Sequence, residues 1–474
     1  MRITFHGAAR QVTGSAHLLE VGRYRILLDC GLFDSDRVSP DSPNRHFTFE
    51  PTELDAVIVS HAHNDHIGRL PCLMRAGYDG PVYTTRATAD ILNVMLRDSA
   101  RIQREDARTF ALRKTNEDLR TPAPAIAAHA EPPGPLFELH DVEWLIENLR
   151  RLPYGEPIEI LDGVSLTFLD AGHILGSALV QLDVVEDGRE RRLLFTGDLG
   201  RRSMGLLPDP TIVKNIDILI SESTYGNKEL DPYDKLIKQL HAIVARATRL
   251  QSKIVIPAFS LGRTQRMVYC FQELFTVHKV RPIPVYVDSP LALRLTDIYR
   301  EYPEAYTPFA RRMMEADGQL FNSPHITFCA SWDESRRLNH LSGPLVIIAS
   351  SGMCEAGRIR HHLRHTVEDP DNAIVIVSYQ AEGTLGRQLA EGVERVQIFD
   401  QWHDLNAAVY VLDGFSGHAD RNDLAWWYEQ TGGGIDRAFL VHGEPESMLA
   451  LAPVLQPYVK HEVCLPETLG TYEF

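Results

Sequence analysis

A group of metal-binding residue types stands in the segment HAHNDH, which begins at His61 and holds three histidines and one aspartate. The segment directly follows the apolar run 55–60, whose β-branched residues predict a strand. Residues two apart in an extended chain point the same way, so His61 and His63 can reach one metal ion. Asp65 and His66, where the chain turns, can face a second ion. Imidazole and carboxylate suit zinc better than iron or manganese. The alternative interpretation is a polar helix start with surface histidines.

Other polar side chains lie at the ends of predicted strands, which would position them. Short apolar runs rich in β-branched residues predict buried strands at 25–29, 55–60, 192–198, 216–223, 253–259, 284–288, 344–352, 372–379 and 438–444. Between many of these runs the sequence predicts helices, for example over 233–250, 264–277 and 423–428, so the fold class is α/β. Polar residues interrupt or close several runs, namely Asp29, His61, Asp198, Glu222 and His442. Sites on open sheets gather at such strand ends.

Length and charge limit the organisation. A chain of 474 residues exceeds what one hydrophobic core usually serves, which predicts two substantial domains. The shares of 44% apolar and 24% charged residues are typical of globular enzymes. The net charge of −16 argues against nonspecific binding of polyanions by the whole surface, so any nucleic-acid site must be local.

Cysteine use and hydropathy bear on the compartment. The six cysteines are scattered and form no CxxC pair, which favours reduced thiols and a cytoplasmic protein. The first residues lack the basic-then-apolar pattern of a signal peptide, and no apolar run approaches the roughly 20 residues of a membrane span. A stretch rich in Pro and Ala over 120–135 predicts an irregular loop between two helices.

Seven short motifs follow one another along the chain. They are LLDCG with Asp29, HAHNDH, AGHILGS with His173, FTGDLG with Asp198, SESTYGN with Glu222, FSGHAD with His418 and LVHGE with His442. This series resembles that of the β-CASP ribonucleases of the metallo-β-lactamase superfamily, which include the cleavage and polyadenylation specificity factor endonuclease. The resemblance implies an α/β fold in which an αββα sandwich, formed by 1–226 and 414–474, receives an inserted parallel α/β unit, the β-CASP domain, over 227–413.

The resemblance also implies a ligand set for two zinc ions per chain. The ligands form two sets that share a bridging aspartate: His61, His63 and His173 for one ion, Asp65, His66 and His442 for the other, and Asp198 for both. Asp29 resembles a carboxylate that orients a ligand imidazole rather than a ligand itself. Outside the motifs, His173 would be interpreted as a structural histidine and Asp198 as a turn or helix cap.

The catalytic residues that the resemblance implies are Asp29, Asp65, Glu222 and His418. Two metal ions can lower the pKa of a bridging water toward ~7 and clamp a phosphate oxygen. His418 would give a proton to the leaving oxygen, and Glu222 would hold its ring. The alternative is that His418 only caps a helix that begins near Asp420.

An RNA substrate is indicated by two further features. Small-molecule members of the superfamily generally lack the insertion, and family members that process RNA have His at the last motif, here His442, where DNA-directed members commonly have Val. Candidate contacts to single-stranded RNA are Arg263, Arg266, Ser351, Arg358, Arg360 and Ser378. At helical spacing Arg358, His362 and His365 share a face, for which a solvated surface is the alternative.

Three functional classes remain. The first is a ribonuclease of RNA processing or decay, endonucleolytic or 5′-to-3′ exonucleolytic, with a homodimer left open. The second is a small-ester or thioester hydrolase on the same metal site. The third, a noncatalytic scaffold, is disfavoured because such partner subunits usually lose metal ligands, and this chain keeps them all.

Overall fold

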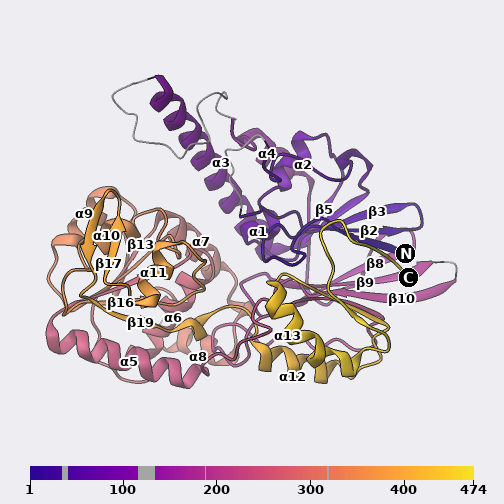
Figure 1. Ribbon diagram of the computed structural model, residues 1–474. Helices are drawn as coiled ribbons and strands as arrows, with labels where there is room; N and C mark the ends of the chain where they lie inside the picture. The colour runs from indigo at the N-terminus through magenta and orange to yellow at the C-terminus, as the bar shows by residue number, and fades with distance from the viewer. Residues whose placement is uncertain (35–40, 116–133, 187, 318–319) are drawn as a thin grey trace.

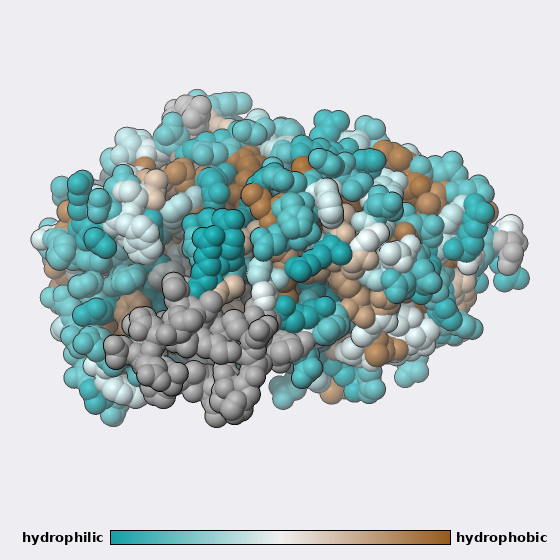
Figure 2. Space-filling view, turned by 90° about the horizontal axis from the view of Figure 1, so that it is seen from above, coloured by the Kyte–Doolittle hydropathy of each residue, from teal (hydrophilic) through white to brown (hydrophobic). Residues whose placement is uncertain are grey.

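The computed structural model describes residues 1–34, 41–115, 134–186, 188–317 and 320–474, and it contains two units of different architecture (Figure 1). One unit contains two seven-stranded sheets, and the other is built on one six-stranded sheet. Both units mix helices with strands, which confirms the predicted α/β class. No helix within these ranges has the length and apolar character that a membrane span requires. Seen from above, hydrophilic residues cover most of the surface, and hydrophobic ones are interspersed among them (Figure 2).

The first seven-stranded sheet has the order β22-β1-β2-β3-β4-β5-β6. Its strands are β1 (Arg2–Phe5), β2 (His17–Val21), β3 (Tyr24–Leu28), β4 (Ala56–Ile58), β5 (Val82–Thr85), β6 (Leu149–Leu152) and β22 (Thr471–Glu473). The strands β22, β1, β2 and β3 pair antiparallel, and those from β3 to β6 pair parallel.

The second seven-stranded sheet has the order β21-β20-β11-β10-β9-β8-β7. Its strands are β7 (Ile158–Leu161), β8 (Val164–Asp170), β9 (Ala178–Glu186), β10 (Arg189–Phe195), β11 (Ile218–Glu222), β20 (Arg437–Val441) and β21 (Val463–Cys464). The strands from β7 to β10 pair antiparallel, and β10, β11, β20 and β21 pair parallel.

The two sheets pack face to face and are covered by helices on their outer faces (Figure 1). In β10, Leu193 and Phe195 enter the apolar layer between the sheets, whereas Leu194 packs with the outer helices, because successive side chains of a strand alternate. The helices are α1 (Asn64–Ile67), α2 (Leu70–Arg75), α3 (Arg86–Thr115) and α4 (Leu139–Asn148) beside the first sheet, and α12 (Arg421–Thr431) and α13 (Pro445–Leu455) beside the second. This is the predicted αββα sandwich.

The second unit is inserted between β11 and β20 and has a six-stranded sheet of order β14-β13-β15-β12-β16-β19. All of its pairings are parallel, as the sequence predicts. Its strands are β12 (Lys253–Pro257), β13 (Val285–Asp288), β14 (Ile326–Phe328), β15 (Leu345–Ala349), β16 (Ala373–Ile376) and β19 (Ala408–Val411), and a separate hairpin is formed by β17 (Arg395–Ile398) and β18 (Gln401–Asp404).

Helices cover both faces of this sheet, which buries its strands on two sides. In β12, Ile254 and Ile256 pack with α5, α6 and α7, whereas Val255 packs with α9, α10 and α11. The helices are α5 (Tyr233–Leu250), α6 (Arg263–Thr276), α7 (Pro290–Glu301), α8 (Pro308–Asp317), α9 (Trp332–His340), α10 (Ile359–Arg364) and α11 (Leu385–Glu391).

The predicted elements are present, with shifts at their ends. The helix predicted over 233–250 has these bounds in α5, and the two predicted over 264–277 and 423–428 correspond to α6 and α12. The strands predicted over 192–198 and 344–352 end earlier, at Phe195 and Ala349, so the polar residues that follow lie in loops. The irregular stretch predicted over 120–135 falls almost entirely outside the described residues, between α3 and α4.

A buried arginine, Arg201, contacts both segments through which the chain passes between the two units. Arg201 is 6% exposed, and its Nη1 donates to the carbonyl oxygens of Asp231, at 3.1 Å, on the way into the inserted unit and of Gly414 on the way out. Its guanidinium also lies 3.3 Å from a carboxylate oxygen of Asp423 and 3.6 Å from one of Asp420. The same side chain therefore fixes both connections to the sandwich.

Candidate functional site

His61 and His63 follow β4, where the chain turns into α1. His61 is completely buried, and His63 is the N-cap of α1, with an extended backbone (φ −73°, ψ 149°). His61 Nε2 lies 3.1 Å from His63 Nδ1, so the two rings direct one nitrogen each toward a common point.

A first set of four donor atoms is completed by His173 and Asp198. His173 Nε2 lies 3.2 Å from His63 Nδ1. Asp198 Oδ2 lies 3.2 Å from His61 Nε2 and 3.4 Å from His173 Nε2. A tetrahedral zinc ion with bonds of about 2.0–2.1 Å separates its ligand atoms by about 3.3 Å. The four atoms therefore have the spacing that this metal requires.

A second set adjoins the first and uses the other oxygen of Asp198. Asp198 Oδ1 lies 3.3 Å from His66 Nε2 and 3.5 Å from His442 Nε2. The two Nε2 atoms are 3.1 Å apart, and His442 Nε2 lies 3.3 Å from Asp65 Oδ2. The structure thus brings all seven ligands named from the sequence into two adjoining groups.

The chemistry of these groups fits bound cations. Both carboxylate oxygens of Asp198 are buried without a hydrogen-bond partner among the described residues. Burial by itself would raise the pKa of Asp198, but His442, His66 and the neighbouring rings hold it well below its usual value. Burial lowers the pKa of His63 to about 3 and holds that of His173 well below its usual value. For His63, His173 and Asp198 these directions favour the neutral ring and the ionised carboxylate, which are the forms that bind metal.

Asp29 contacts the ring of His66 directly and the ring of His61 through Ser60. Its Oδ2 lies 2.7 Å from His66 Nδ1, and its carboxylate accepts hydrogen bonds from the backbone N and the hydroxyl of Ser60 at 2.7 and 2.9 Å. Ser60 Oγ in turn lies 3.1 Å from His61 Nδ1. A ring whose Nδ1–H is bound in this way presents the lone pair of Nε2 to a metal.

Thr224 holds His442 in the same way and was missed from the sequence. Its hydroxyl donates to the carbonyl oxygen of His442 at 2.9 Å, so it accepts from Nδ1–H of the same residue, also at 2.9 Å. His442 itself has a left-handed backbone (φ 52°), and its N–H donates to the carbonyl of Ala8 at 2.7 Å. Only its place in the SESTYGN motif could have indicated Thr224.

His418 lies beside the first set. Its Nδ1 is 3.3 and 3.4 Å from the two oxygens of Glu222 and 3.7 Å from Asp198 Oδ2. Burial by itself lowers the pKa of His418, but the charges of Glu222 and Asp198 outweigh it and raise the pKa to about 9. These two carboxylates therefore favour the protonated form of the ring.

The backbone near His418 is tied to the loop that carries Asp198. His418 forms an antiparallel bridge with Gly200, and Ala419 N donates to Leu199 O at 2.7 Å. The helix that follows, α12, is capped by Asp420, whose side chain accepts from two backbone N–H groups. The cap of this helix is thus formed by Asp420 and not by the His418 side chain.

Arg263, one of the predicted RNA contacts, is the first residue of α6, and this helix begins near the donor groups. A Cβ atom built on Gly262 would lie 3.9 Å from His63 Nε2. The neighbouring Arg263 has buried Nε and Nη1 atoms without a partner among the described residues, and burial lowers its pKa to about 9. Arg266 is 4% exposed, and its Nη1 donates to Met204 O at 3.4 Å. Arg263 thus has donors left for an anion.

Three other predicted RNA contacts lie in loops and a helix of the inserted unit. Ser351 follows β15 and Ser378 follows β16, and their hydroxyls accept hydrogen bonds from Ala356 N at 3.2 Å and Gln380 Nε2 at 3.3 Å. On α10, the guanidinium of Arg360 lies 4.5 Å from the ring centroid of Phe399.

Arg358 lies inside the inserted unit, unlike the surface position expected from the sequence. Its side chain is 8% exposed, and Nη1 lies 2.6 Å from Asp288 Oδ1. His362 Nε2 lies 2.7 Å from the other oxygen of Asp288. The helix face that Arg358 and His362 share is therefore turned toward β13, and only His365 of the three is exposed.

We expect Arg358→Ala to lower the free energy of unfolding by about 3–5 kcal/mol, because Asp288 would stay buried without one of its charged partners. Urea denaturation measures this change. Arg364→Ala on the same helix, where the side chain is exposed, is the control and should change the stability by less than about 0.5 kcal/mol. Weaker RNA binding at unchanged stability would contradict this account of Arg358.

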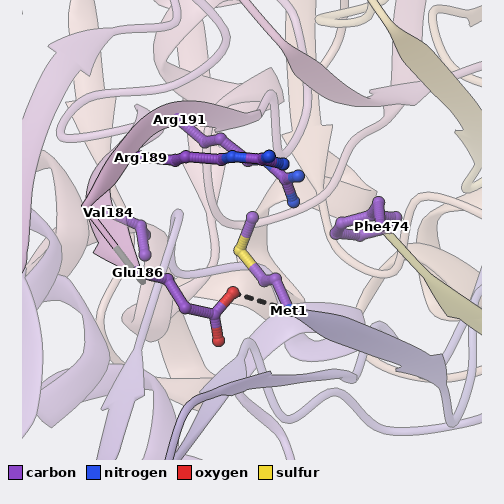
Figure 3. Close-up of a pocket in the computed structure, with 6 residues that line it drawn as sticks. All are labelled: Met1, Val184, Glu186, Arg189, Arg191 and Phe474. Carbon is purple, nitrogen blue, oxygen red and sulfur yellow. Dashed lines mark hydrogen bonds and ion pairs between the residues drawn. The ribbon is translucent and has the colours of Figure 1, made fainter.

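A pocket elsewhere in the sandwich contains none of the predicted site residues (Figure 3). The N-terminal ammonium group lies 2.8 Å from Glu186 Oε2 within it. Its lining consists of Met1, Val184, Glu186, Arg189, Arg191 and Phe474. Arg189 and Arg191 have no ion pair with any of the described residues.

Three known families match successive parts of the chain. Residues 9–257 match the metallo-beta-lactamase superfamily, and the chain belongs to it. Residues 264–389 match the Beta-Casp domain, and residues 402–466 match the Zn-dependent metallo-hydrolase RNA specificity domain. Within the superfamily the chain is therefore a member of the β-CASP family, as the motif series predicts, and is a metal-dependent hydrolase.

Similar proteins support this assignment. A ribonuclease from Thermus thermophilus is 37% identical over 456 residues, which cover 96% of each chain. A transcription termination factor from Methanocaldococcus jannaschii is 31% identical, over 99% of this chain and 71% of its own length. A crystal structure of a protein of unknown function from Enterococcus faecalis shares the fold, with a TM-score of 0.55 and 14% identity over 99% of both chains.

Proposed function

We propose that this protein is a zinc-dependent ribonuclease that hydrolyses the phosphodiester bonds of RNA, in RNA processing or decay, with two metal ions and His418 as proton donor. The observation that carries the proposal is the pair of donor groups that meet at the buried, unpartnered carboxylate of Asp198. An RNA substrate is supported by the ribonuclease relative and by the match of the last part of the chain to an RNA specificity domain.

The residues of the two groups would hold the metal ions. His61, His63 and His173 would hold one ion, and Asp65, His66 and His442 would hold the other. Asp198 offers one oxygen to each group. Two bound zinc ions would supply an activated water and positive charge at the phosphate. Asp29 and Thr224 orient the rings of His66 and His442 so that Nε2 of each faces inward.

His418 supplies the proton that the leaving oxygen needs. Because Nδ1 faces the carboxylate of Glu222, Nε2 is the nitrogen free to donate, and no described residue is hydrogen-bonded to it. The negative charge of Glu222, which faces Nδ1, favours the protonated ring before the reaction. Glu222 is completely buried and also accepts from Leu199 N at 2.6 Å, so its position is fixed.

The inserted unit helps to hold the RNA backbone near these groups. The buried Nε and Nη1 atoms of Arg263 have no partner among the described residues, and the first turn of α6 lies close to His63. Arg263 as a whole is partly exposed, and a phosphate of RNA has the charge and the acceptor atoms to pair with its guanidinium. Arg263 is therefore the proposed phosphate contact nearest to the reacting bond.

The proposal is tested by metal analysis together with substrate choice. We expect purified protein to contain close to two equivalents of zinc and to cleave end-labelled single-stranded RNA. Matched DNA and simple esters should be cleaved much more slowly. Full activity with one equivalent, even after zinc is added, would refute the two-metal site. Faster hydrolysis of esters than of RNA would favour the small-ester hydrolase, and metal binding without any hydrolysis would favour the scaffold.

A further inference from the structure

Two helices of the inserted unit, α9 and α10, present a basic surface that the proposed chemistry does not use. Trp332, Arg336 and His340 are four residues apart on α9, so they form one stripe of the helix. On α10 and at its end lie His361, Arg364 and His365. All six side chains are exposed. We call this set the α9–α10 surface.

Ring contacts at both ends place the two helices side by side. The rings of Trp332 and His361 meet edge to face with centroids 6.1 Å apart. The rings of His340 and His365 have centroids 6.4 Å apart. Arg336 lies one helical turn from each end of the stripe on α9. The six residues therefore form one continuous surface rather than two separate groups.

The positive charge of this surface is not neutralised by neighbours. Arg336 and Arg364 have no ion pair or hydrogen bond with any residue in the described part of the chain. The pKa of His361 lies below its usual value, first because of partial burial and then because of the cationic neighbours His362, Arg364, Arg360 and Arg336. In a chain with a net charge of −16, such a concentration of unpaired cations is a local feature.

An exposed aromatic ring adds a second kind of contact. Trp332 is 56% exposed, and the guanidinium of Arg358 lies 4.8 Å from its ring centroid, on one side only. Proteins bind single-stranded nucleic acid by stacking bases on aromatic rings beside cations that contact phosphates. An acidic peptide would use the arginines but would gain little from a flat open ring.

We propose that the α9–α10 surface binds single-stranded RNA apart from the two donor groups, with a base stacked on Trp332 and phosphates on Arg336 and Arg364. This inference rests on the proposed ribonuclease function and adds a second contact zone to it. Two contact zones on one strand raise the affinity for long RNA over short RNA, because the second binding event is intramolecular.

The test compares Trp332→Ala and Arg336→Ala/Arg364→Ala with wild type. The control is Arg189→Ala/Arg191→Ala, which removes the same charge from two arginines of β10 that are also unpaired among the described residues. Fluorescence anisotropy measures binding of a long oligouridylate whose phosphorothioate linkages resist hydrolysis. Each surface variant should bind about tenfold more weakly. The double arginine variant, which loses two phosphate contacts, should also lower the slope of log affinity against log salt by about 1.4.

Activity measurements separate this surface from the catalytic proposal. Both surface variants should lower kcat/KM for long RNA and leave hydrolysis of bis(p-nitrophenyl) phosphate unchanged. Unchanged binding by both variants, or an equal loss in the control, would overturn the inference. Tighter binding of poly-glutamate than of RNA would overturn it in favour of an acidic protein partner. A wild type that binds RNA here but cleaves none would refute the ribonuclease and leave the surface intact.

Discussion

Asp198→Asn is expected to weaken both metal sites at once and to lower RNA cleavage by at least about 10³-fold. Each carboxylate oxygen of Asp198 belongs to a different donor group, so the amide of asparagine would remove one ligand atom and the shared negative charge. Zinc content by elemental analysis should fall below one equivalent, together with the activity.

Asp29→Asn is the matched control for this substitution, because it makes the same chemical change in a residue that holds a ring. Asp29 contacts His66 Nδ1 and contributes no donor atom of its own to either group. It should lower metal affinity by about 10- to 100-fold, an effect that added zinc repairs. If Asp198→Asn kept two equivalents of metal and most of the activity, the shared-ligand arrangement would be wrong.

His418→Ala should keep both metal ions and lower the cleavage rate by about 10²- to 10⁴-fold, the usual scale of general acid catalysis. In the proposed mechanism the ring protonates the leaving oxygen, and His418 is not among the seven proposed metal ligands. A substrate with a better leaving group, such as a bridging phosphorothiolate, needs less protonation and should recover much of the loss. Single-turnover cleavage of both substrates measures this recovery.

Glu222→Gln should show a smaller defect in the same direction, because this residue only orients the ring and raises its basicity. His418 also lies close enough to Asp198 and His442 to be considered a metal ligand. Loss of a metal ion in His418→Ala would mean that His418 is a metal ligand. If the activated substrate raises the rate of His418→Ala no more than that of wild type, His418 is not the proton donor.

Much of the fold could be predicted because its information is local. The apolar runs alternate with helical patterns, and the parallel sheet of the inserted unit follows from runs such as PLVIIASSG. The candidate metal ligands could be named because HAHNDH holds four of them in six residues, and the remaining ones lie in recognisable motifs. These features can be recognised without knowing which distant residues contact one another.

The contacts that orient the ligands could not be predicted in this way. Thr224 and Ser60 are hydroxyl residues of a common kind, and only the folded chain shows that each accepts from a ring Nδ1–H. Arg358 was placed on the surface because helical spacing shows which residues share a face but not which way that face is turned. Asp288, 70 positions away, is the partner that turns it inward.

The hydrogen bonds of Arg201 explain how a large unit can be inserted between two strands of the sandwich. The strands on either side of the insertion, β11 and β20, are direct neighbours in their sheet. The carbonyl groups of Asp231 and Gly414 contact one guanidinium, so the two ends of the inserted segment meet at a single point. A segment whose ends meet can be gained or lost without separating the flanking strands, because a short linker closes the gap at little entropic cost. Arg201 thus marks the single point at which the inserted unit is attached to the sandwich.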